Sequence, residues 1–360
     1  MHVVTLRQLL DDMVQHKASD LHITAGVPPV LRIDGELAPT NYDVLTPDGT
    51  ASLAYSVMSD EQRKKFETTK ELDFSFGVKG LARFRSNVYL QRGVVSMAIR
   101  QIPYEILPLE KLGLPPIARD FTNRHKGMIL ITGPTGSGKS TTLASMIDKI
   151  NGTRSSHIMT IEDPIEYIHH HKKCIVNQRE VGADTESFPK ALKYVLRQDP
   201  DIILIGEMRD LETIEAALTI AETGHLVFAT LHTNSTYEAV NRIVDVFPSD
   251  QQKQILTQLA FTLEGVMTQQ LIPRSKGGGR VMCAEVLVCT PAIKAVIREG
   301  KTHQIYSLMQ AGQKYGMQTM NQALLQAVLD KQLKPEDALE RSTDRPEIEQ
   351  MLNKVGRMAA

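Results

Sequence analysis

The sequence has few cysteines. Only three occur among 360 residues, and none of them forms a Cys-x-x-Cys spacing: they are Cys174, Cys283 and Cys289. An odd number of scattered cysteines argues against a disulfide framework and against a zinc site built from cysteine ligands. The sequence therefore predicts a protein that folds in a reducing compartment.

The sequence also has no surplus of positive charge. Its 41 Lys and Arg residues nearly balance 42 Asp and Glu residues, which leaves a formal net charge of −1. A protein that binds nucleic acid more often carries a basic surplus, because that surplus supplies its affinity for phosphates. The balance therefore favours protein partners over nucleic acid, and it does little to oppose self-association.

Long apolar runs are missing as well. Residues 1–7 lack the basic and then apolar layout of a signal peptide. The apolar run 128–132 has the length of a buried strand, far short of the roughly 20 residues that a transmembrane helix needs. We therefore expect a cytosolic chain with no direct membrane insertion, which would act at a membrane only through a partner.

The chain is long enough for at least two folded units. Residues 1–100 combine an amphipathic helical stripe, a hairpin signal at Asp34-Gly35, and a period-two alternation that begins at Leu72. They predict a small α+β domain built on an antiparallel sheet. The prolines within residues 101–116 then predict an interdomain linker.

Residues 117–360 alternate short apolar runs with helical patterns. Strands are predicted at 128–132, 157–161, 202–205 and 226–230, and helices at 139–150, 188–196 and 211–221. That alternation predicts an α/β fold with a mainly parallel sheet covered by helices. From about residue 251 we expect a largely helical chain, interrupted by one strand pair around 281–288 and mostly helical from about residue 290.

The segment Gly133-Pro-Thr-Gly-Ser-Gly-Lys-Ser140 fits the pattern G-x-x-x-x-G-K-[ST] and lies between a predicted strand and a predicted helix. Its glycines let backbone N–H groups turn toward phosphates, and the helix N-terminus adds a positive field. Lys139 would reach the β- and γ-phosphates of ATP, and the Ser140 hydroxyl would ligate Mg²⁺. The expected nucleotide-binding residues are Gly133, Pro134, Thr135, Gly136, Ser137, Gly138, Lys139, Ser140 and Thr141. The alternative, a glycine-rich turn that matches by chance, is disfavoured because strand, lysine, serine and helix are all in register.

Acidic residues follow two of the predicted strands. Glu207 follows the run 202–205, where a P-loop protein needs a carboxylate for its metal, although a surface glutamate after a core strand is the alternative. A second cluster contains Glu162 and Glu166, either of which could position or deprotonate an attacking water. Carboxylates in a turn after a strand are often merely solvated, which is the alternative for this pair.

Histidines and arginines give weaker signals. His225 and His232 bracket the run 226–230, and an imidazole there could sense a γ-phosphate or could be a structural hydrogen-bonding residue. Arg83 and Arg85 lie on the polar face of one predicted strand, within about 7 Å of each other. They line an exposed sheet face, or they complete a neighbouring subunit's site and stabilise charge on a transferred phosphoryl group.

Four motifs together resemble the secretion ATPases of type II secretion and type IV pilus systems. After the P-loop come the family's Asp box, its atypical Walker B and its His box: Ile161-Glu-Asp-Pro-Ile-Glu166, Gly206-Glu-Met-Arg-Asp210 and Gly224-His-Leu-Val-Phe-Ala-Thr-Leu-His-Thr233. The resemblance continues through Ser19-Asp-Leu-His22, Arg83-Phe-Arg85 and Gly316-Met-Gln-Thr-Met320, so it spans nearly the whole chain.

The resemblance implies a PAS-like domain at 1–100 and a RecA-like ATPase domain at 117–360, joined by the linker 101–116. It implies a homohexameric motor that hydrolyses ATP with Mg²⁺ to retract type IV pili in twitching motility. Its implied partners are the inner-membrane pilus platform protein and an accessory paralogous ATPase. Its implied place is the cytoplasmic face of the inner membrane at the pilus base.

The resemblance also implies roles for single residues. Glu207 would hold Mg²⁺ through water, Glu166 would be the catalytic carboxylate, and Glu162 is the second choice for that role. Two histidines would couple the γ-phosphate to subunit movement, and two arginines would act as arginine fingers between subunits: His232, then His225, and Arg83 with Arg85.

Two features distinguish the branches of this family. Extension and secretion ATPases carry an added N-terminal domain and a tetracysteine zinc insertion, and we expect neither here. Retraction ATPases carry a helix that reads AIRNLIRE, to which Ala292-Ile-Lys-Ala-Val-Ile-Arg-Glu299 corresponds, with Lys294 and Ala295 in place of arginine and asparagine. The alternatives are an accessory paralogue with little hydrolysis, an extension or secretion ATPase, and a DNA-translocating relative that the near-neutral charge disfavours.

Overall fold

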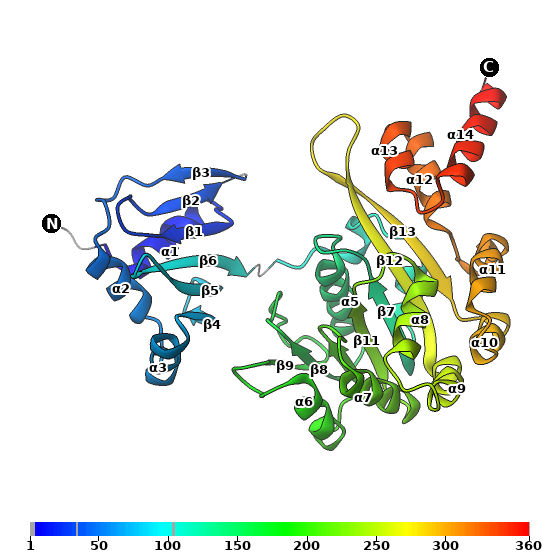
Figure 1. Ribbon diagram of the computed structural model, residues 1–360, viewed down its shortest axis with the longest axis horizontal. Helices are drawn as coiled ribbons and strands as arrows, with labels where there is room; N and C mark the ends of the chain where they lie inside the picture. Colours follow the sequence, from blue (N-terminus) through cyan, green and yellow to red (C-terminus); the bar gives the residue numbers. More distant parts are fainter. Residues whose placement is uncertain (1–3, 34, 103–104, 360) are drawn as a thin grey trace. The chain divides into compact units, whose positions relative to one another are not determined.

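The computed structural model describes residues 4–33, 35–102 and 105–359, with side chains up to residue 354 (Figure 1). The chain divides into two compact units, each of which is described by itself. The first unit comprises Met1–Glu105 and Glu166–Ile168, and the second comprises Ile106–Ile165 and His169–Ala360. The division after Glu105 falls inside the segment 101–116.

The first unit is an antiparallel sheet with three helices. Its elements are α1 (Leu6–Gln15), β1 (Asp20–Ile23), β2 (Val30–Ile33), β3 (Glu36–Pro39), α2 (Pro47–Tyr55), α3 (Asp60–Thr69), β4 (Glu71–Val78), β5 (Ala82–Gln91) and β6 (Val94–Ile102). The strand order is β3-β2-β1-β6-β5-β4, and every neighbouring pair is antiparallel. This confirms the α+β class predicted for the first part of the chain.

Local sequence explains these elements. Helix α1 begins with a capping box between Thr5 and Gln8, which satisfies N–H groups that a helix start leaves unpaired. Strand β5 alternates strictly, with Phe84 and Val88 fully buried, while Arg83 and Arg85 are half-buried on its other face. The predicted division of this strand into an apolar and a polar face is therefore confirmed.

The second unit is built on a seven-stranded sheet. Its elements are η1 (Leu109–Lys111), α4 (Ile117–Thr122), β7 (Gly127–Thr132), α5 (Lys139–Thr153), β8 (His157–Glu162), β9 (Ile175–Glu180), α6 (Phe188–Val195), η2 (Leu196–Gln198), β10 (Ile202–Ile205), α7 (Leu211–Glu222), β11 (Leu226–Leu231), α8 (Thr236–Asp245), α9 (Gln252–Thr262), β12 (Leu263–Pro273), β13 (Arg280–Val288), α10 (Pro291–Arg298), η3 (Thr302–Gln304), α11 (Ile305–Ala311), η4 (Gln313–Tyr315), α12 (Met320–Leu329), α13 (Pro335–Arg341) and α14 (Arg345–Ala359). The strand order is β13-β12-β7-β11-β10-β8-β9, and all pairs are parallel except β12 with β13.

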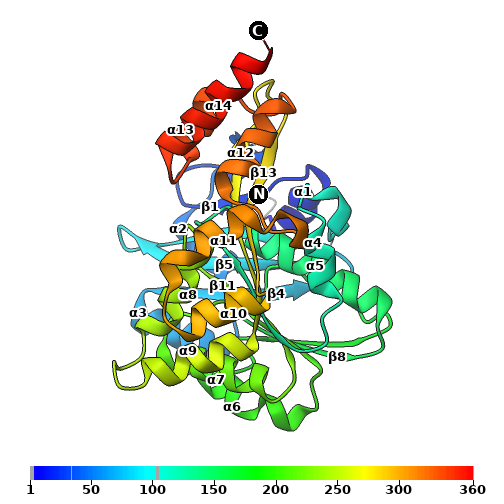
Figure 2. The same ribbon diagram turned by 90° about the vertical axis from the view of Figure 1, so that its right-hand side faces the viewer.

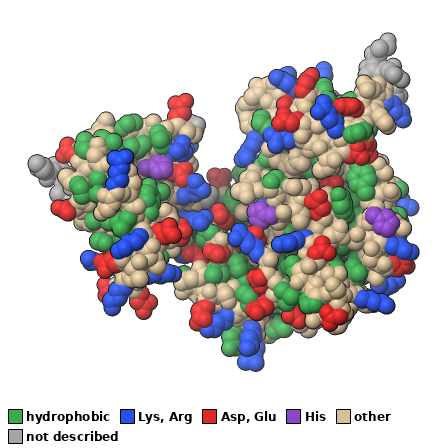
Figure 3. Space-filling view, in the orientation of Figure 1, with side chains coloured by type: hydrophobic (Ala, Val, Ile, Leu, Met, Phe, Trp, Pro, Cys, Tyr) green, Lys and Arg blue, Asp and Glu red, His purple; other side chains and the backbone are tan. Residues whose placement is uncertain are grey.

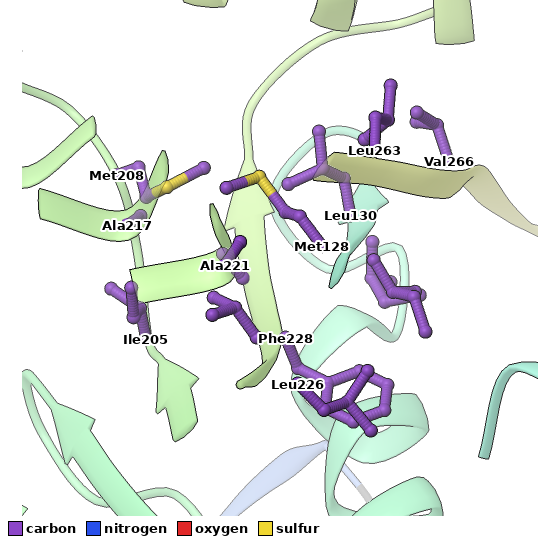
Figure 4. Close-up of a cluster of buried hydrophobic side chains, with 14 of the residues drawn as sticks. Met128, Leu130, Ile205, Met208, Ala217, Ala221, Leu226, Phe228, Leu263 and Val266 are labelled. Carbon is purple, nitrogen blue, oxygen red and sulfur yellow. The ribbon is translucent and has the colours of Figure 1, made fainter. Parts of the chain in front are cut away.

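Helices cover both faces of this sheet. Along the sheet, the connection from β7 to β8 through α5 runs toward the β9 edge. The connections from β10 to β11 and from β11 to β12 run toward the opposite edge, at β13. Because parallel crossovers are right-handed, α5 lies on one face and α7, α8 and α9 lie on the opposite face. All residues of β7, β10 and β11 are consequently buried. Figure 4 shows part of this core, where side chains of β7, β10, β11, α7 and β12 meet.

Strand β12 corrects the prediction for the segment after residue 251. Between residues 251 and 273, the helix α9 ends at Thr262, and residues 263–273 then form a buried strand beside β7. The strand is hard to recognise because Thr268 and Gln269 are polar although fully buried, and Gly265 interrupts its apolar run. The partner strand β13 does lie at the predicted position around 281–288.

We expect Gly265→Ala to destabilise the second unit, because β12 passes close to the ring of Phe121 at this glycine. A Cβ at residue 265 would lie 2.3 Å from Cζ and 2.5 Å from Cε1 of that fully buried ring. Overpacking of this kind costs about 1–3 kcal/mol, and each kcal/mol lowers Tm by roughly 2–4 °C in a domain of this size. The matched control is Gly152→Ala in α5, where a Cβ meets no atom within 4 Å. Equal melting temperatures for the two variants would contradict the expectation.

The chain beyond β13 is helical, as predicted from about residue 290. Figure 2 shows α10 and α11 with α12, α13 and α14 beyond them toward the C-terminus. Within residues 4–33, 35–102 and 105–359, none of the helices combines the length and the apolar character that crossing a bilayer requires.

Candidate nucleotide-binding site

The glycine-rich segment connects the end of β7 with the start of α5. Gly133, Gly136 and Gly138 have φ angles of 136°, 79° and 91°, which residues with a Cβ rarely adopt. A Cβ at Gly133 would lie 2.4 Å from the backbone oxygen of Gln269 in β12. The turn therefore packs directly against β12, and only glycine fits at residue 133. The segment is thus a strand-to-helix cradle, as its sequence predicts.

The start of α5 is suited to binding a phosphate. The N-cap residue of the helix is Gly138, which has no side chain that could occupy this helix end. The hydroxyl of Ser137 is buried and has no hydrogen-bond partner within the described part of the chain. Because a helix N-terminus attracts anions, these residues fit the phosphates of a nucleotide.

Lys139 points its ammonium group into the same cradle. The side chain is buried, and Nζ donates to the carbonyl oxygens of Gly133 at 2.8 Å and Pro134 at 3.1 Å. Burial lowers the pKa of Lys139, while the negative charge of Glu207 opposes this shift. The ammonium group is therefore held at the position where negative phosphate oxygens would stabilise it.

Strand register brings the other motifs to the same edge of the sheet. Thr132 of β7 pairs with Leu231 of β11, Ile205 of β10 pairs with Ala229, and Ile161 of β8 pairs with Ile205. Gly133, His232 and Gly206 follow β7, β11 and β10, and Glu162 is the last residue of β8. Ligands in open α/β sheets bind outside the carboxyl ends of the strands, which is this edge.

Glu207 lies at this edge, close enough to Lys139 for their charges to interact, and two other side chains contact its carboxylate. Its carboxylate accepts hydrogen bonds from Arg209 Nε at 2.6 Å and Nη2 at 2.7 Å, and His232 Nε2 lies 3.3 Å from its Oε1. Burial would raise the pKa of Glu207, but the hydrogen bonds from Arg209 and the charges of His232, Arg209 and Lys139 lower it below its usual value. The carboxylate is therefore ionised at neutral pH, as a ligand of Mg²⁺ or of its bound water needs to be.

The two candidate bases differ in their surroundings. Glu162 is buried, and its Oε1 accepts hydrogen bonds from Thr160 Oγ1 at 2.6 Å and from Gln178 Nε2 at 3.3 Å. Glu166 is exposed and belongs to the segment grouped with the first unit. Ser140, by contrast, is exposed at the start of α5, where its hydroxyl can reach a bound metal.

The structure separates His225 from the P-loop. His225 precedes β11, and its carbonyl oxygen accepts from Gly127 N at the start of β7, whereas the P-loop follows the end of β7. The two ends of such a strand lie roughly 20 Å apart. His225 Nδ1 is within hydrogen-bond distance of Thr223 Oγ1 and the Ile220 carbonyl, contacts of the kind that its structural alternative predicts. Its role in coupling the γ-phosphate to subunit movement stays a prediction.

Arg83 and Arg85 belong to the first unit, in β5. Their roles in a site formed with the second unit stay a prediction.

Sequence reasoning missed three residues of the site. Arg209 lies inside a motif that was identified, but its hydrogen bonds to Glu207 depend on the turn after β10. Gln269 is buried under the cradle, and its Nε2 donates to Thr142 Oγ1 of α5 at 2.8 Å. Arg280 of β13 reaches the carbonyl oxygen of Gly136 at 3.4 Å. A polar glutamine within an apolar run was the only signal available for Gln269.

A metal site made by the protein alone is not found among the described residues, since no three His, Cys, Asp or Glu side chains gather there. Mg²⁺ in nucleotide sites is instead bound by one or two protein ligands together with phosphates and water. Ser140 and Glu207 fit that mode.

Comparison with known proteins agrees with this geometry. The model of the family described as "Type II/IV secretion system protein" matches residues 2–340. The type IV pilus retractation ATPase PilT of Pseudomonas aeruginosa is 48% identical over 94% of this chain and 98% of its own, and the type IV pilus ATPase PilU of the same organism is 44% identical over 92% and 87%. A crystal structure of the pilus retraction motor PilT with bound ADP superposes with a TM-score of 0.91 at 52% identity, covering 96% of this chain and 99% of that one. The chain belongs to the type II/IV secretion system protein family.

Proposed function

We propose that this chain is the subunit of an ATP-hydrolysing motor that powers retraction of type IV pili. The observation that carries the proposal is that Lys139 and the ionised Glu207, which interact electrostatically, lie at a glycine-rich P-loop that opens helix α5. The extent of the likeness to PilT, over 94% of this chain, supports the choice of pilus retraction.

The proposed chemistry assigns each residue a task. Lys139 would leave the P-loop carbonyls to contact the β- and γ-phosphates, and Ser140 and Glu207 would hold Mg²⁺, Glu207 through water. The metal would supply positive charge at the phosphates. His232, next to Glu207, would sense the γ-phosphate.

Glu166 is the proposed base for the attacking water, and Glu162 is the second candidate. Oε1 of Glu162 already accepts hydrogen bonds from Thr160 and Gln178, whereas Glu166 is exposed. This supports Glu166 as the first choice.

The proposed assembly is a homohexamer in which Arg83 and Arg85 of one subunit complete the site of another. An arginine supplied in this way would stabilise charge on the transferred phosphoryl group. We further propose that the ring works at the cytoplasmic face of the inner membrane on the pilus platform protein, together with an accessory paralogous ATPase. Figure 3 shows basic and acidic side chains interspersed on the visible face of each unit, which supports protein partners over nucleic acid.

An accessory role is the second candidate, because the likeness to PilU at 44% identity is nearly as extensive. In α10, Ile293 and Ile297 are fully buried, and Lys294 Nζ forms an ion pair with Glu264 Oε1 at 2.8 Å. The lysine that replaces the arginine of the retraction motif thus still anchors this helix to β12, which supports the retraction role.

The test is complementation in two bacterial strains, one without its retraction ATPase and one without only the accessory paralogue. We expect this chain to restore twitching in the first strain and to remove its surplus surface pili. Rescue of the second strain alone would support the accessory role. Failure in both, with purified protein that still releases phosphate from ATP, would contradict a role in retraction and leave ATP hydrolysis standing; DNA-stimulated turnover would indicate a DNA-translocating relative.

A further inference from the structure

Glu285 is a buried carboxylate at a junction of two helix starts, away from the P-loop. It lies on β13 and is only 2% exposed. Its Oε1 accepts hydrogen bonds from the backbone N–H of Thr236 at 2.7 Å and from the Thr236 hydroxyl at 2.8 Å, and its Oε2 accepts from the N–H of Met320 at 3.3 Å. Burial raises the pKa of the Glu285 carboxyl, and these hydrogen bonds oppose the rise.

Thr236 and Met320 are the first residues of α8 and α12. Each of these helices has its own cap, Ser235 for α8 and Thr319 for α12, so Glu285 is not needed for the helices to start. The carboxylate instead satisfies first-turn N–H groups of both helices and joins two segments that are far apart in the sequence. A buried side chain that accepts hydrogen bonds from two helix starts fixes the position of one relative to the other.

The α8 side of the junction leads directly to the nucleotide site. Only residues 232–235 separate the end of β11 from Thr236, and the first of them is His232, 3.3 Å from Glu207. This connection is short, and a hydrogen bond of 3.0 Å from Asn234 N to Glu238 Oε2 fixes it to α8. A displacement of the start of α8 would therefore move the histidine that contacts Glu207.

The α12 side leads into the C-terminal helices. The segment before α12 is bound to β13 by two backbone hydrogen bonds between Val286 and Gln318. Asn321, the second residue of α12, is buried and bonded to Ser342 and to Glu347 of α14. Glu347 in turn accepts from Tyr306 and Gln310 of α11. Polar contacts thus connect α11, α12 and α14 to the strand that carries Glu285.

We propose that Glu285 is a positioning residue for ATP hydrolysis, which fixes the start of α8, and with it His232, against β13 and the C-terminal helices. The inference rests on the proposed ATPase function. It assigns Glu285 an effect on turnover and none on nucleotide affinity, because the P-loop and Lys139 belong to β7 and α5. Movement of the C-terminal helices and the geometry at Glu207 change together through this residue.

The first test is Glu285→Gln in the full-length protein, with phosphate release measured over a range of ATP and Mg²⁺ concentrations. An amide can supply one acceptor oxygen but turns an NH₂ group toward the other N–H donor. Small displacements of a catalytic group can lower turnover up to about 100-fold, and we expect kcat to fall about tenfold. KM for ATP should stay within about twofold, because ground-state binding is untouched.

Two matched pairs separate positioning from packing and remain informative if Glu285→Gln does not fold. Thr236→Val removes the hydroxyl that donates a hydrogen bond to Glu285 and keeps the side-chain shape. Thr236→Ser keeps the hydroxyl and removes a methyl group. Met320→Pro removes the backbone N–H that donates to Glu285. Proline fits there because Met320 is the first residue of α12 and the preceding Thr319 is extended. Met320→Ala is the control, because it also removes the buried methionine side chain but keeps the N–H.

We expect Thr236→Val and Met320→Pro to lower kcat at least about threefold below Thr236→Ser and Met320→Ala, with KM for ATP unchanged. Equal turnover within each pair, wild-type turnover in Glu285→Gln, or a raised KM at unchanged kcat would overturn the positioning role. Wild-type protein that does not hydrolyse ATP would contradict the proposed function itself, and the positioning role with it.

Discussion

Lys139→Ala is expected to reduce Mg²⁺-dependent ATP hydrolysis by about 100-fold or more. The ammonium group is buried in the P-loop, where it donates to the carbonyl oxygens of Gly133 and Pro134. It is thus pre-positioned to exchange these neutral acceptors for phosphate oxygens that gain charge in the transition state. An alanine leaves that charge without its cation, so both nucleotide affinity and turnover should fall.

The measurement is phosphate release at saturating ATP, together with binding of a fluorescent ADP analogue. The matched control is Lys149→Ala on the same helix, because Lys149 pairs with Glu110 outside the P-loop. An ion pair that is exposed in this way contributes little, so this variant should behave as wild type. If Lys139→Ala kept more than about one tenth of the wild-type rate, the assignment of Lys139 as the phosphate-contacting cation would be wrong.

Glu207→Gln should produce a loss of similar size, on the order of 100-fold in turnover. The carboxylate is ionised because Arg209, His232 and Lys139 surround it, and its negative charge is what a metal-bound water would recognise. The amide keeps the shape and one acceptor oxygen but removes that charge. We therefore expect the Mg²⁺ concentration that gives half-maximal activity to rise as well.

A Mg²⁺ titration of ATP hydrolysis distinguishes this effect from a general loss of structure. Glu212→Gln, at an exposed position in the first turn of α7, changes the same side chain five residues away and should leave the titration unchanged. If Glu207→Gln lost activity with no change in its Mg²⁺ dependence, the carboxylate would act on Arg209 or His232 and not on the metal.

Much of the fold was predictable because its determinants are local. The alternation in β5, the capping residues of α1 and α2 and the apolar runs of β7, β10 and β11 each identify an element without reference to the rest of the chain. Strand β12 was not predictable in this way. Within β12, the Thr268 hydroxyl bonds to Thr132 of β7 and Gln269 Nε2 donates to Thr142 of α5, so the partners that allow these polar side chains to be buried lie far away in the sequence.

The nucleotide site likewise has a part determined by local sequence and a part determined by tertiary packing. The P-loop is a contiguous segment whose glycines, lysine and helix start act on one another directly, so the order of its residues determined the cradle and the place of Lys139. Which other motifs join it depended on strand register: the same strand β11 carries His232 to the P-loop edge and His225 to the opposite edge. The contacts of Glu285 with Thr236 and Met320 likewise exist only after β13, α8 and α12 have packed together.

The sequence by itself determined the nucleotide cradle because backbone conformation and helix capping are local. Only the tertiary structure decided which charged groups surround that cradle, because strand pairing and burial bring together residues that the sequence keeps apart.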